Sequence, residues 1–405
     1  MNAPHSPSLL AGVQMAPRDP ILGLTEAYNA DKNPKKVNLG VGVYTGDDGK
    51  VPLLECVRRA EHQLVEQPVA RNYLPIDGLA AYDKAVQGLV FSADCPALKE
   101  GRIVTVQTLG GTGGLRVGAD FLHRTAPNAA LWISDPSWEN HRAVFESAGF
   151  KVNTYRYYDA RTRGVDFDGM LAALKAMPAG DVVLLHACCH NPTGVDLSTA
   201  QWASVAETMA ARGLVPFLDI AYQGFGDGID ADGSAVRLFA QSGMPLLVAN
   251  SFSKSFSLYG ERVGSLNVVA GTSEEGARVL SQIKRLVRSN YSNPPTHGSK
   301  IVAAVLASPE LRTLWEQELG QMRDRIKSMR KLLVEKIHAR VPGANFSFIT
   351  QQRGMFSYSG LTKEQVVRMR EEFAVYAIES GRICVAALNT KNIDYSADAI
   401  VKVIG

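Results

Sequence analysis

Seven short apolar runs, separated by stretches of helical character, occupy the middle of this 405-residue chain. Most of the runs lack the strict polar alternation that marks a strand with one solvent-exposed face. The segments between them, such as 139–148, 198–211 and 234–241, are long enough for crossover helices. The pattern predicts an α/β fold with a mostly parallel seven-stranded sheet and helices on both faces. The expected strands are residues 103–107, 131–134, 152–155, 182–186, 215–219, 246–250 and 265–269.

The pattern changes near Pro309. Across residues 311–337, apolar side chains recur every three or four positions, which predicts one long amphipathic helix. A helix that packs on a core and joins two units is favoured over a coiled coil. We expect a large domain over residues 46–320 and a small α+β domain made of residues 1–45 and 321–405. Its elements are expected as strands near 37–44, 355–358 and 383–385 and helices at 363–373 and 393–401.

Composition narrows the class of protein. Apolar residues make up 46% and charged residues 20%, which is typical of a globular chain. The net charge of +3 comes without a basic block, so neither nucleic acid nor an anionic membrane is expected as a partner. An odd number of cysteines, two of them adjacent, favours a reducing compartment. Residues 1–7 lack a secretory signal and the chain lacks a long apolar run, so we expect a cytoplasmic location.

Polar side chains follow the ends of several predicted strands. In an open parallel sheet, ligands bind beyond the carboxyl ends of the strands. The first strand leads into the glycine-rich segment 110–114 and then a helix, where backbone N–H groups can face an anion, although a tight turn explains the glycines as well. The spacing fits neither a Walker A loop nor a dinucleotide site. Later strands are followed by Asn191, by Asp219 and Tyr222, and by Ser251, Ser253, Lys254 and Arg262. An anion cup, an amine and a carboxylate are what pyridoxal phosphate needs.

Four ordered motifs carry a family resemblance. They are His190-Asn191-Pro192-Thr193-Gly194, Asp219-x-Ala221-Tyr222, Ser251-x-Ser253-Lys254 with Arg262, and Ser380-Gly381-Arg382. The set resembles the fold-type I, class I pyridoxal-phosphate-dependent aminotransferases, most closely the aspartate and aromatic-amino-acid subgroup. The resemblance extends from Asp19-Pro20-Ile21-Leu22 almost to the C-terminus. It implies a homodimer that transfers amino groups between amino acids and 2-oxo acids by a ping-pong mechanism, through an internal aldimine on Lys254.

The resemblance also implies a role for each site residue. Lys254 is implied as the Schiff-base lysine, whose neutral amine later moves a proton. Asp219 is implied as the carboxylate that keeps the pyridine nitrogen protonated. Tyr222 and Asn191 are implied as hydrogen-bond donors to the phenolic oxygen of the cofactor. The implied phosphate cup is Gly111, Thr112, Ser251, Ser253 and Arg262, joined by Tyr73 from the neighbouring subunit, with Trp138 stacked on the ring.

The implied substrate site continues from these residues. Arg382 is expected to pair bidentately with the substrate α-carboxylate, assisted by the backbone N–H of Gly42. Arg288 is implied to bind a distal carboxylate across the dimer. Phe356, Trp138 and Asn191 complete the pocket. For His141 and His186, places around the cofactor and in the core remain open. The segment His186-x-Cys188-Cys189-His190 suggests a metal, but its buried position favours packing, so no metal is expected.

The choice of amino acid is less clear from the sequence. Segments 134–141, 252–262 and 354–360 resemble aromatic-amino-acid aminotransferases, whereas Val43, Asn72, Thr112 and Asn293 resemble the aspartate enzymes. We expect transamination of Phe, Tyr and Trp, and of aspartate and glutamate, with 2-oxoglutarate as acceptor. An aspartate aminotransferase with weak aromatic activity is the alternative. Alternatives of other classes are a pyridoxal-phosphate lyase or decarboxylase, an oxidoreductase built on the 110–114 segment, and a non-catalytic binding protein.

Overall fold

The protein is represented by a computed structural model that describes residues 8–17 and 21–405. The predictions that concern residues 1–7, Asp19 and Pro20 lie outside the described residues. Among the helices described, none has the length and apolar character needed to cross a membrane. All five cysteines are free.

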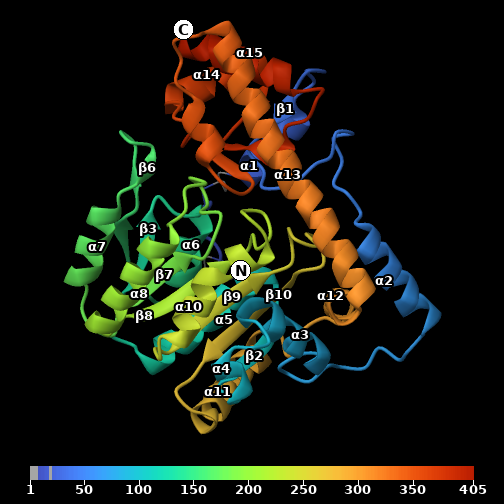
Figure 1. Cartoon of the computed structure of the whole chain (residues 1–405), viewed down its shortest axis with the longest axis vertical. Coiled ribbons are helices and arrows are strands. Elements are labelled where there is room, and N and C mark those ends of the chain that lie inside the picture. The colour runs from blue at the N-terminus through green and yellow to red at the C-terminus, as the bar shows by residue number, and fades with distance from the viewer. Residues whose placement is uncertain (1–7, 18–20) are drawn as a thin grey trace, which may run out of the picture.

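A seven-stranded sheet forms the centre of the larger part of the molecule (Figure 1). Its spatial order is β2 (Ile103–Leu109), β10 (Val263–Val269), β9 (Leu246–Ser251), β8 (Val215–Ile220), β7 (Val182–His186), β3 (Leu131–Asp135) and β4 (Val152–Arg156). β10 is antiparallel to both of its neighbours, and the other pairs are parallel. The predicted fold class and all seven predicted strands are confirmed, with small differences at the strand ends.

Both faces of this sheet are covered, as its apolar strands require. In β7, Val182 and Leu184 belong to one core, and the alternate residues Val183 and Leu185 belong to the other. The first core includes α5 (Gly110–Thr125), α6 (Glu139–Ser147) and α11 (Ser273–Asn290). The second includes α3 (Ala80–Phe91), α7 (Phe167–Ala176), α8 (Thr199–Arg212) and α10 (Ser234–Gln241). Each large aliphatic side chain buried in this way stabilises the folded state by about 1.5–3 kcal/mol relative to an exposed one.

The glycine-rich segment differs from the expected loop followed by a helix, because α5 begins within it, at Gly110. The helix lies directly on the sheet. A side chain at Gly114 would come within 2.7 Å of the Ser265 carbonyl oxygen, and one at Gly118 within 2.5 Å of the Phe217 ring. These glycines therefore allow close packing of the helix on the sheet, and the first turn of α5 lies at the carboxyl edge of the parallel strands.

The smaller part contains two short sheets. β1 (Val37–Asn38) pairs in parallel with β12 (Val375–Tyr376), and β11 (Phe356–Tyr358) pairs antiparallel with β13 (Arg382–Cys384). The strand predicted over 37–44 ends early because Asn38 Oδ1 accepts hydrogen bonds from the backbone N–H groups of Gly40 and Val41, which turns the chain. The helices of this part are α14 (Lys363–Phe373) and α15 (Ile393–Ile404), with short 3₁₀ turns η1 (Ser347–Gln351) and η2 (Val385–Ala387).

The helix α13 (Pro309–Arg340) runs between the sheet and the C-terminal helices (Figure 1). Pro309 occupies its first turn, and the Ser308 hydroxyl accepts a hydrogen bond from the Leu311 N–H at 3.3 Å. Its apolar stripe, which includes Trp315 and Ile326, is buried in the main core. The predicted helix packed on a core is confirmed. The residue boundaries of the two domains remain a prediction.

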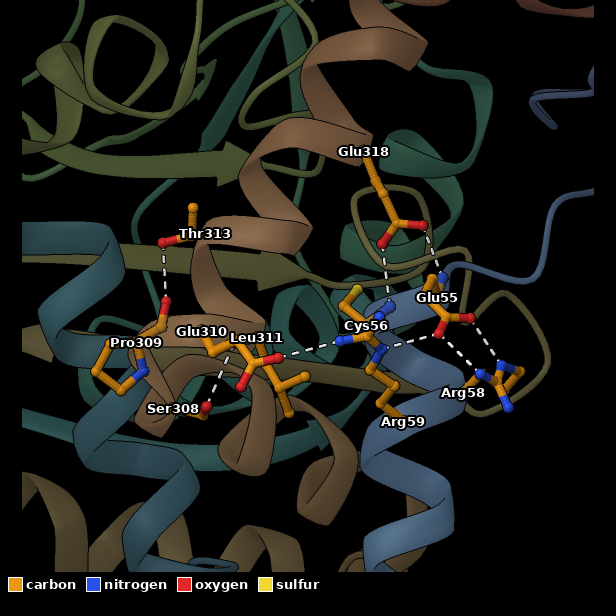
Figure 2. Close-up of polar contacts among 10 residues, drawn as sticks. All are labelled: Glu55, Cys56, Arg58, Arg59, Ser308, Pro309, Glu310, Leu311, Thr313 and Glu318. Atoms are coloured by element: carbon orange, nitrogen blue, oxygen red, sulfur yellow. Dashed lines mark hydrogen bonds and ion pairs between the residues drawn. The ribbon is translucent and has the colours of Figure 1, made fainter.

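Figure 2 shows how α13 holds α2 (Glu55–Glu66). The carboxylate of Glu318 accepts hydrogen bonds from the backbone N–H of Glu55 at 2.6 Å and of Cys56 at 3.0 Å. A side chain of one helix therefore caps the N-terminus of another helix distant in sequence. The remaining elements are α1 (Leu22–Ala30), α4 (Pro96–Lys99), α9 (Ile229–Asp232), α12 (His297–Ala307), β5 (Tyr158–Asp159) and β6 (Gly164–Val165).

Candidate active site

A cavity of about 260 Å³ lies at the carboxyl ends of the central parallel strands, where the sheet topology predicts a ligand site. Every site residue expected within one chain lines it, in addition to Ile21, Leu115, His186, Ala221 and Tyr259. The expected residues are Gly42, Gly111, Thr112, Trp138, Asn191, Asp219, Tyr222, Ser251, Ser253, Lys254, Arg262, Phe356 and Arg382.

Tyr73 and Arg288 do not line this cavity. Tyr73 lies between α2 and α3 with 91% of its surface exposed. Arg288, in the last turn of α11, lines a separate surface cavity with Arg124 and Lys284, and its guanidinium donates a hydrogen bond to the Ser292 hydroxyl. Their roles across a dimer therefore stay a prediction.

Asp219 is a buried carboxylate near the end of β8 with a built-in partner. Its Oδ2 lies 3.0 Å from Nε2 of His141, and Nδ1 of the same ring lies 2.9 Å from the Ser137 hydroxyl. An ionised carboxylate only accepts hydrogen bonds, so Nε2 donates to it; in the neutral ring, Nδ1 then accepts from the Ser137 hydroxyl. Burial raises the pKa of Asp219, but the His141 hydrogen bond and nearby positive charge, including Lys254, bring it below the ordinary value. The site therefore presents a fixed negative charge.

Lys254 follows β9 and extends into the cavity. Its Nζ lies 5.0 Å from the centroid of the Tyr222 ring. Burial lowers the pKa of Lys254 to about 8, although the carboxylate of Asp219 opposes the shift; the charge of Arg262 adds to it. The amine therefore becomes neutral at a lower pH than an ordinary lysine, and the neutral state is the one that a nucleophilic amine requires.

The first turn of α5 and three polar side chains form an anion cradle. Arg262 Nη1 donates hydrogen bonds to Ser253 Oγ at 3.2 Å and to the Tyr259 carbonyl oxygen at 3.0 Å. Gly111 lies against Ser251, since a side chain there would approach Ser251 Cβ to 3.1 Å. The N-terminus of a long helix adds partial positive charge and free backbone N–H groups. This arrangement suits a phosphate group.

Arg382 provides a second anion site in the same cavity and is 1% exposed. Its Nη1 donates to Asn191 Oδ1 at 3.1 Å and its Nη2 donates to the Gly40 carbonyl oxygen at 2.7 Å. Its guanidinium lies over the Phe356 ring, 4.4 Å from the centroid. Its Nε is buried and has no hydrogen-bond partner among the described residues. A buried guanidinium with a free donor is suited to binding a carboxylate.

From the sequence, His141 could lie either around the cofactor or in the core. Ile21, Leu115 and Tyr259 were not predicted as site residues. The structure places His141 directly behind Asp219. The only local signal is its spacing of three residues from Trp138, which puts both rings on one turn, 5.1 Å apart. The Tyr259 hydroxyl accepts a hydrogen bond from the Tyr44 N–H at 3.0 Å and so ties the 40–44 segment to the site.

Two groups of side chains have the composition of a metal site. In the first, His141, His186 and Asp219, the His141–Asp219 hydrogen bond engages two of the three. Burial, with a smaller effect of His141, lowers the pKa of His186 to about 3. In the second, Cys188, Cys189 and Asp232, the Asp232 carboxylate accepts hydrogen bonds from the backbone N–H groups of 224, 226 and 227. The neighbouring His190 ring stacks on the Tyr157 ring with centroids 4.0 Å apart, a contact typical of a histidine packed in the core.

Comparisons with known proteins agree with this geometry. The family described as "Aminotransferase class I and II" matches residues 34–400. The chain is 60% identical to the aspartate aminotransferase of Pseudomonas aeruginosa over 98% of the chain and 100% of that protein. It is 52% identical to the aromatic-amino-acid aminotransferase of Escherichia coli over 95% and 98%. The crystal structure of an aromatic-amino-acid aminotransferase from Burkholderia pseudomallei, covalently bound to pyridoxal phosphate, is 64% identical with a TM-score of 0.96 and covers 98% of this chain and 100% of that one.

Proposed function

The chain belongs to the class I and II aminotransferases, and we propose that it transaminates aromatic amino acids together with aspartate and glutamate, with 2-oxoglutarate as acceptor. The observation that carries the proposal is the convergence of the Lys254 amine, the Asp219 carboxylate and two separate anion sites on one cavity. The relatives named above are aminotransferases, which favours transamination over the oxidoreductase, lyase and non-catalytic alternatives.

The cavity fits pyridoxal phosphate, the cofactor of this family. The cradle of Gly111, Thr112, Ser251, Ser253 and Arg262 has the donors for the phosphate. A side chain at Gly110 would clash with Arg262, and one at Gly111 would crowd Ser251, so both positions need glycine. Lys254 supplies the amine and Asp219 the carboxylate. When bound, the cofactor supplies an electron sink that stabilises negative charge at the substrate Cα.

The proposed roles of the residues follow from their contacts. Asp219, held by His141, orients a protonated ring nitrogen. Asn191 and Tyr222 offer donors beside Lys254, and Trp138 offers a flat apolar face. Arg382 binds the substrate α-carboxylate, and the Lys254 amine, once neutral, accepts and returns the proton that moves during transamination.

The relatives give mixed support on substrate class, because aspartate and aromatic enzymes resemble the chain to a similar degree. A dicarboxylate gains roughly 1.5–3 kcal/mol from a charge-assisted bond to a second arginine. An aromatic ring in the same place leaves that arginine unpaired, so a dual enzyme needs an arginine that can move to solvent. Arg288 lies on the surface, as such a residue must. An aspartate aminotransferase with weak aromatic activity remains the second candidate.

A homodimer completes the proposal. The large apolar side chains that are exposed in the described residues fall in two segments, 9–15 and 51–73. The first contains Leu9 and Met15, both more than nine-tenths exposed, and the second contains Tyr73. Apolar surface of this kind favours burial against a second copy. Tyr73 and Arg288 would then complete the site of the neighbouring subunit. We also propose a cytoplasmic location, which the free cysteines support.

A single-turnover experiment tests the function. The purified holoenzyme is mixed with Phe, Tyr or Asp without a 2-oxo acid, and release of the matching 2-oxo acid is followed by stopped flow. We expect one equivalent per subunit from each donor, and none from the Lys254→Ala variant. If Phe and Tyr react more than about a thousandfold more slowly than Asp, roughly 4 kcal/mol, the second candidate replaces the proposal.

A further inference from the structure

Arg330, in the middle of α13, is a buried cation whose hydrogen-bond acceptors are all uncharged. Its side chain is 1% exposed. Nη2 donates to the carbonyl oxygens of Gly354, at 2.7 Å, and Phe356. Nη1 donates to the Ser357 hydroxyl and, at 3.4 Å, to the Ile349 carbonyl oxygen. One guanidinium thus fixes, by hydrogen bonds, the backbone that leads into β11.

This arrangement is costly for a residue that only fills space. Burial lowers the pKa of Arg330 to about 10, so the side chain stays cationic at neutral pH inside the protein. A buried ion loses its hydration, and apolar residues of similar volume often stabilise a protein as well or better. What an apolar side chain cannot supply is a rigid set of donors that fixes several acceptors at once.

The two-stranded sheet of β11 and β13 carries this grip to the cavity. Phe356 pairs with Cys384, Ser357 with Ile383 and Tyr358 with Arg382. Successive side chains in a strand point to opposite faces, so Ser357 points towards α13, whereas Phe356 shares a face with Arg382. Arg330 therefore contacts the back of the sheet and does not line the cavity.

On the cavity side, the Phe356 ring is closely surrounded. It lies over the Arg382 guanidinium and meets the Tyr222 ring edge-on with centroids 5.9 Å apart. A side chain at Gly42 would come within 2.7 Å of it. A small shift of the Phe356 backbone would therefore move the ring against the Arg382 guanidinium. Asn191 and Gly40 hold its Nη atoms, whereas its Nε has no hydrogen-bond partner among the described residues.

We propose that Arg330 is a positioning residue for the substrate carboxylate: by holding residues 354–357 from behind, it presses the Phe356 ring against Arg382 and so orients the guanidinium. The inference rests on the carboxylate-binding role of Arg382 given under the proposed function. It extends the carboxylate site to a residue on α13, outside the cavity.

The test measures binding, which needs no turnover. The probe is 3-phenylpropionate, which has a carboxylate and an aromatic ring but no amino group, titrated into the holoenzyme by calorimetry. Arg330→Met should weaken its binding about tenfold and raise KM for the amino donor more than it lowers kcat, since small misplacements of a binding group cost up to about a hundredfold. Ser357→Ala, which removes one contact of Arg330, should weaken binding about twofold. The matched control, Lys331→Met on the exposed face of α13, should change neither constant.

A double-mutant cycle separates positioning from general stability. In a Phe356→Leu background, Arg330→Met should add little further loss, because the ring that it positions is gone. Additive losses, or wild-type binding by Arg330→Met, would overturn the inference. If Arg330→Met does not fold, the same cycle with Ser357→Ala decides, and additivity again overturns it. A wild-type enzyme that binds the probe but transfers no amino group would contradict the proposed function and leave this inference standing.

Discussion

Two nearby charges, those of Asp219 and Arg262, shift the pKa of the Lys254 amine in opposite directions. Burial lowers its pKa to about 8, and Asp219 keeps it from falling further. We expect the rate at which cofactor-free protein captures pyridoxal phosphate to rise with pH and to level off above about pH 8, because the neutral amine is the nucleophile. Asp219→Asn removes the opposing charge and should move this midpoint to lower pH. The rate of cofactor capture, followed by absorbance at successive pH values, gives the midpoint for the wild type and for the variant.

Asp227→Asn is the matched control for that titration, since Asp227 pairs with Lys327 and Arg353 at the surface. Its midpoint should equal that of the wild type. A midpoint near pH 10, the range of an ordinary lysine, would show that Lys254 is not buried in this way.

At the scale of the elements, the contact between α13 and α2 substitutes for a missing local cap. The N-cap position of α2 is Leu54, whose side chain cannot accept a hydrogen bond, and Glu318 of α13 takes over that function (Figure 2). Glu318→Ala should lower the free energy of unfolding by about 1–2 kcal/mol, because two backbone donors lose a charged acceptor. The midpoint of urea denaturation reports the loss.

Glu316→Ala, on the exposed side of the same helix, serves as the comparison. Its carboxylate pairs with Arg312 at 3.0 Å, one helical turn away. An exposed pair of this kind contributes under about 0.5 kcal/mol. Equal losses from the two variants would mean that Glu318 stabilises only its own helix.

At the scale of the whole molecule, the proposed exchange of residues between subunits allows a complementation test. Lys254→Ala lacks the amine, and Arg288→Ala should lose far more activity on aspartate than on phenylalanine. Refolding the two together should restore aspartate activity to about one quarter of the wild-type level, since random pairing gives one intact site in half of the dimers.

A different result is expected if Arg288 acts within its own subunit. If Arg288 served its own chain, the mixed dimers would contain no intact site and the aspartate activity would stay at the level of the separate variants. Phenylalanine activity of the Arg288→Ala enzyme alone provides the internal control for folding and cofactor binding.

The strands and the long helix were predictable because each is written into a short stretch of sequence. Continuous apolar runs gave β7 and β8 nearly to the residue, and the spacing of apolar residues gave α13. The glycine segment was misjudged, since glycine before a helix and glycine inside a helix packed on a sheet have the same local pattern. The strand at 37–44 was predicted too long, because the turn that ends it depends on one side-chain oxygen of Asn38.

The sequence by itself determined the sheet, the joining helix and most of the residues that line the cavity. The sheet and the helix follow from local periodicity, and the cavity residues follow from short motifs at strand ends and from the family resemblance of those motifs. Only the tertiary structure decided which side chains support them. His141 is 78 residues from Asp219, Glu318 is 263 from Glu55, and Arg330 is 26 from Phe356. A hydrogen bond between distant segments depends on how whole elements pack, and no local pattern records that packing.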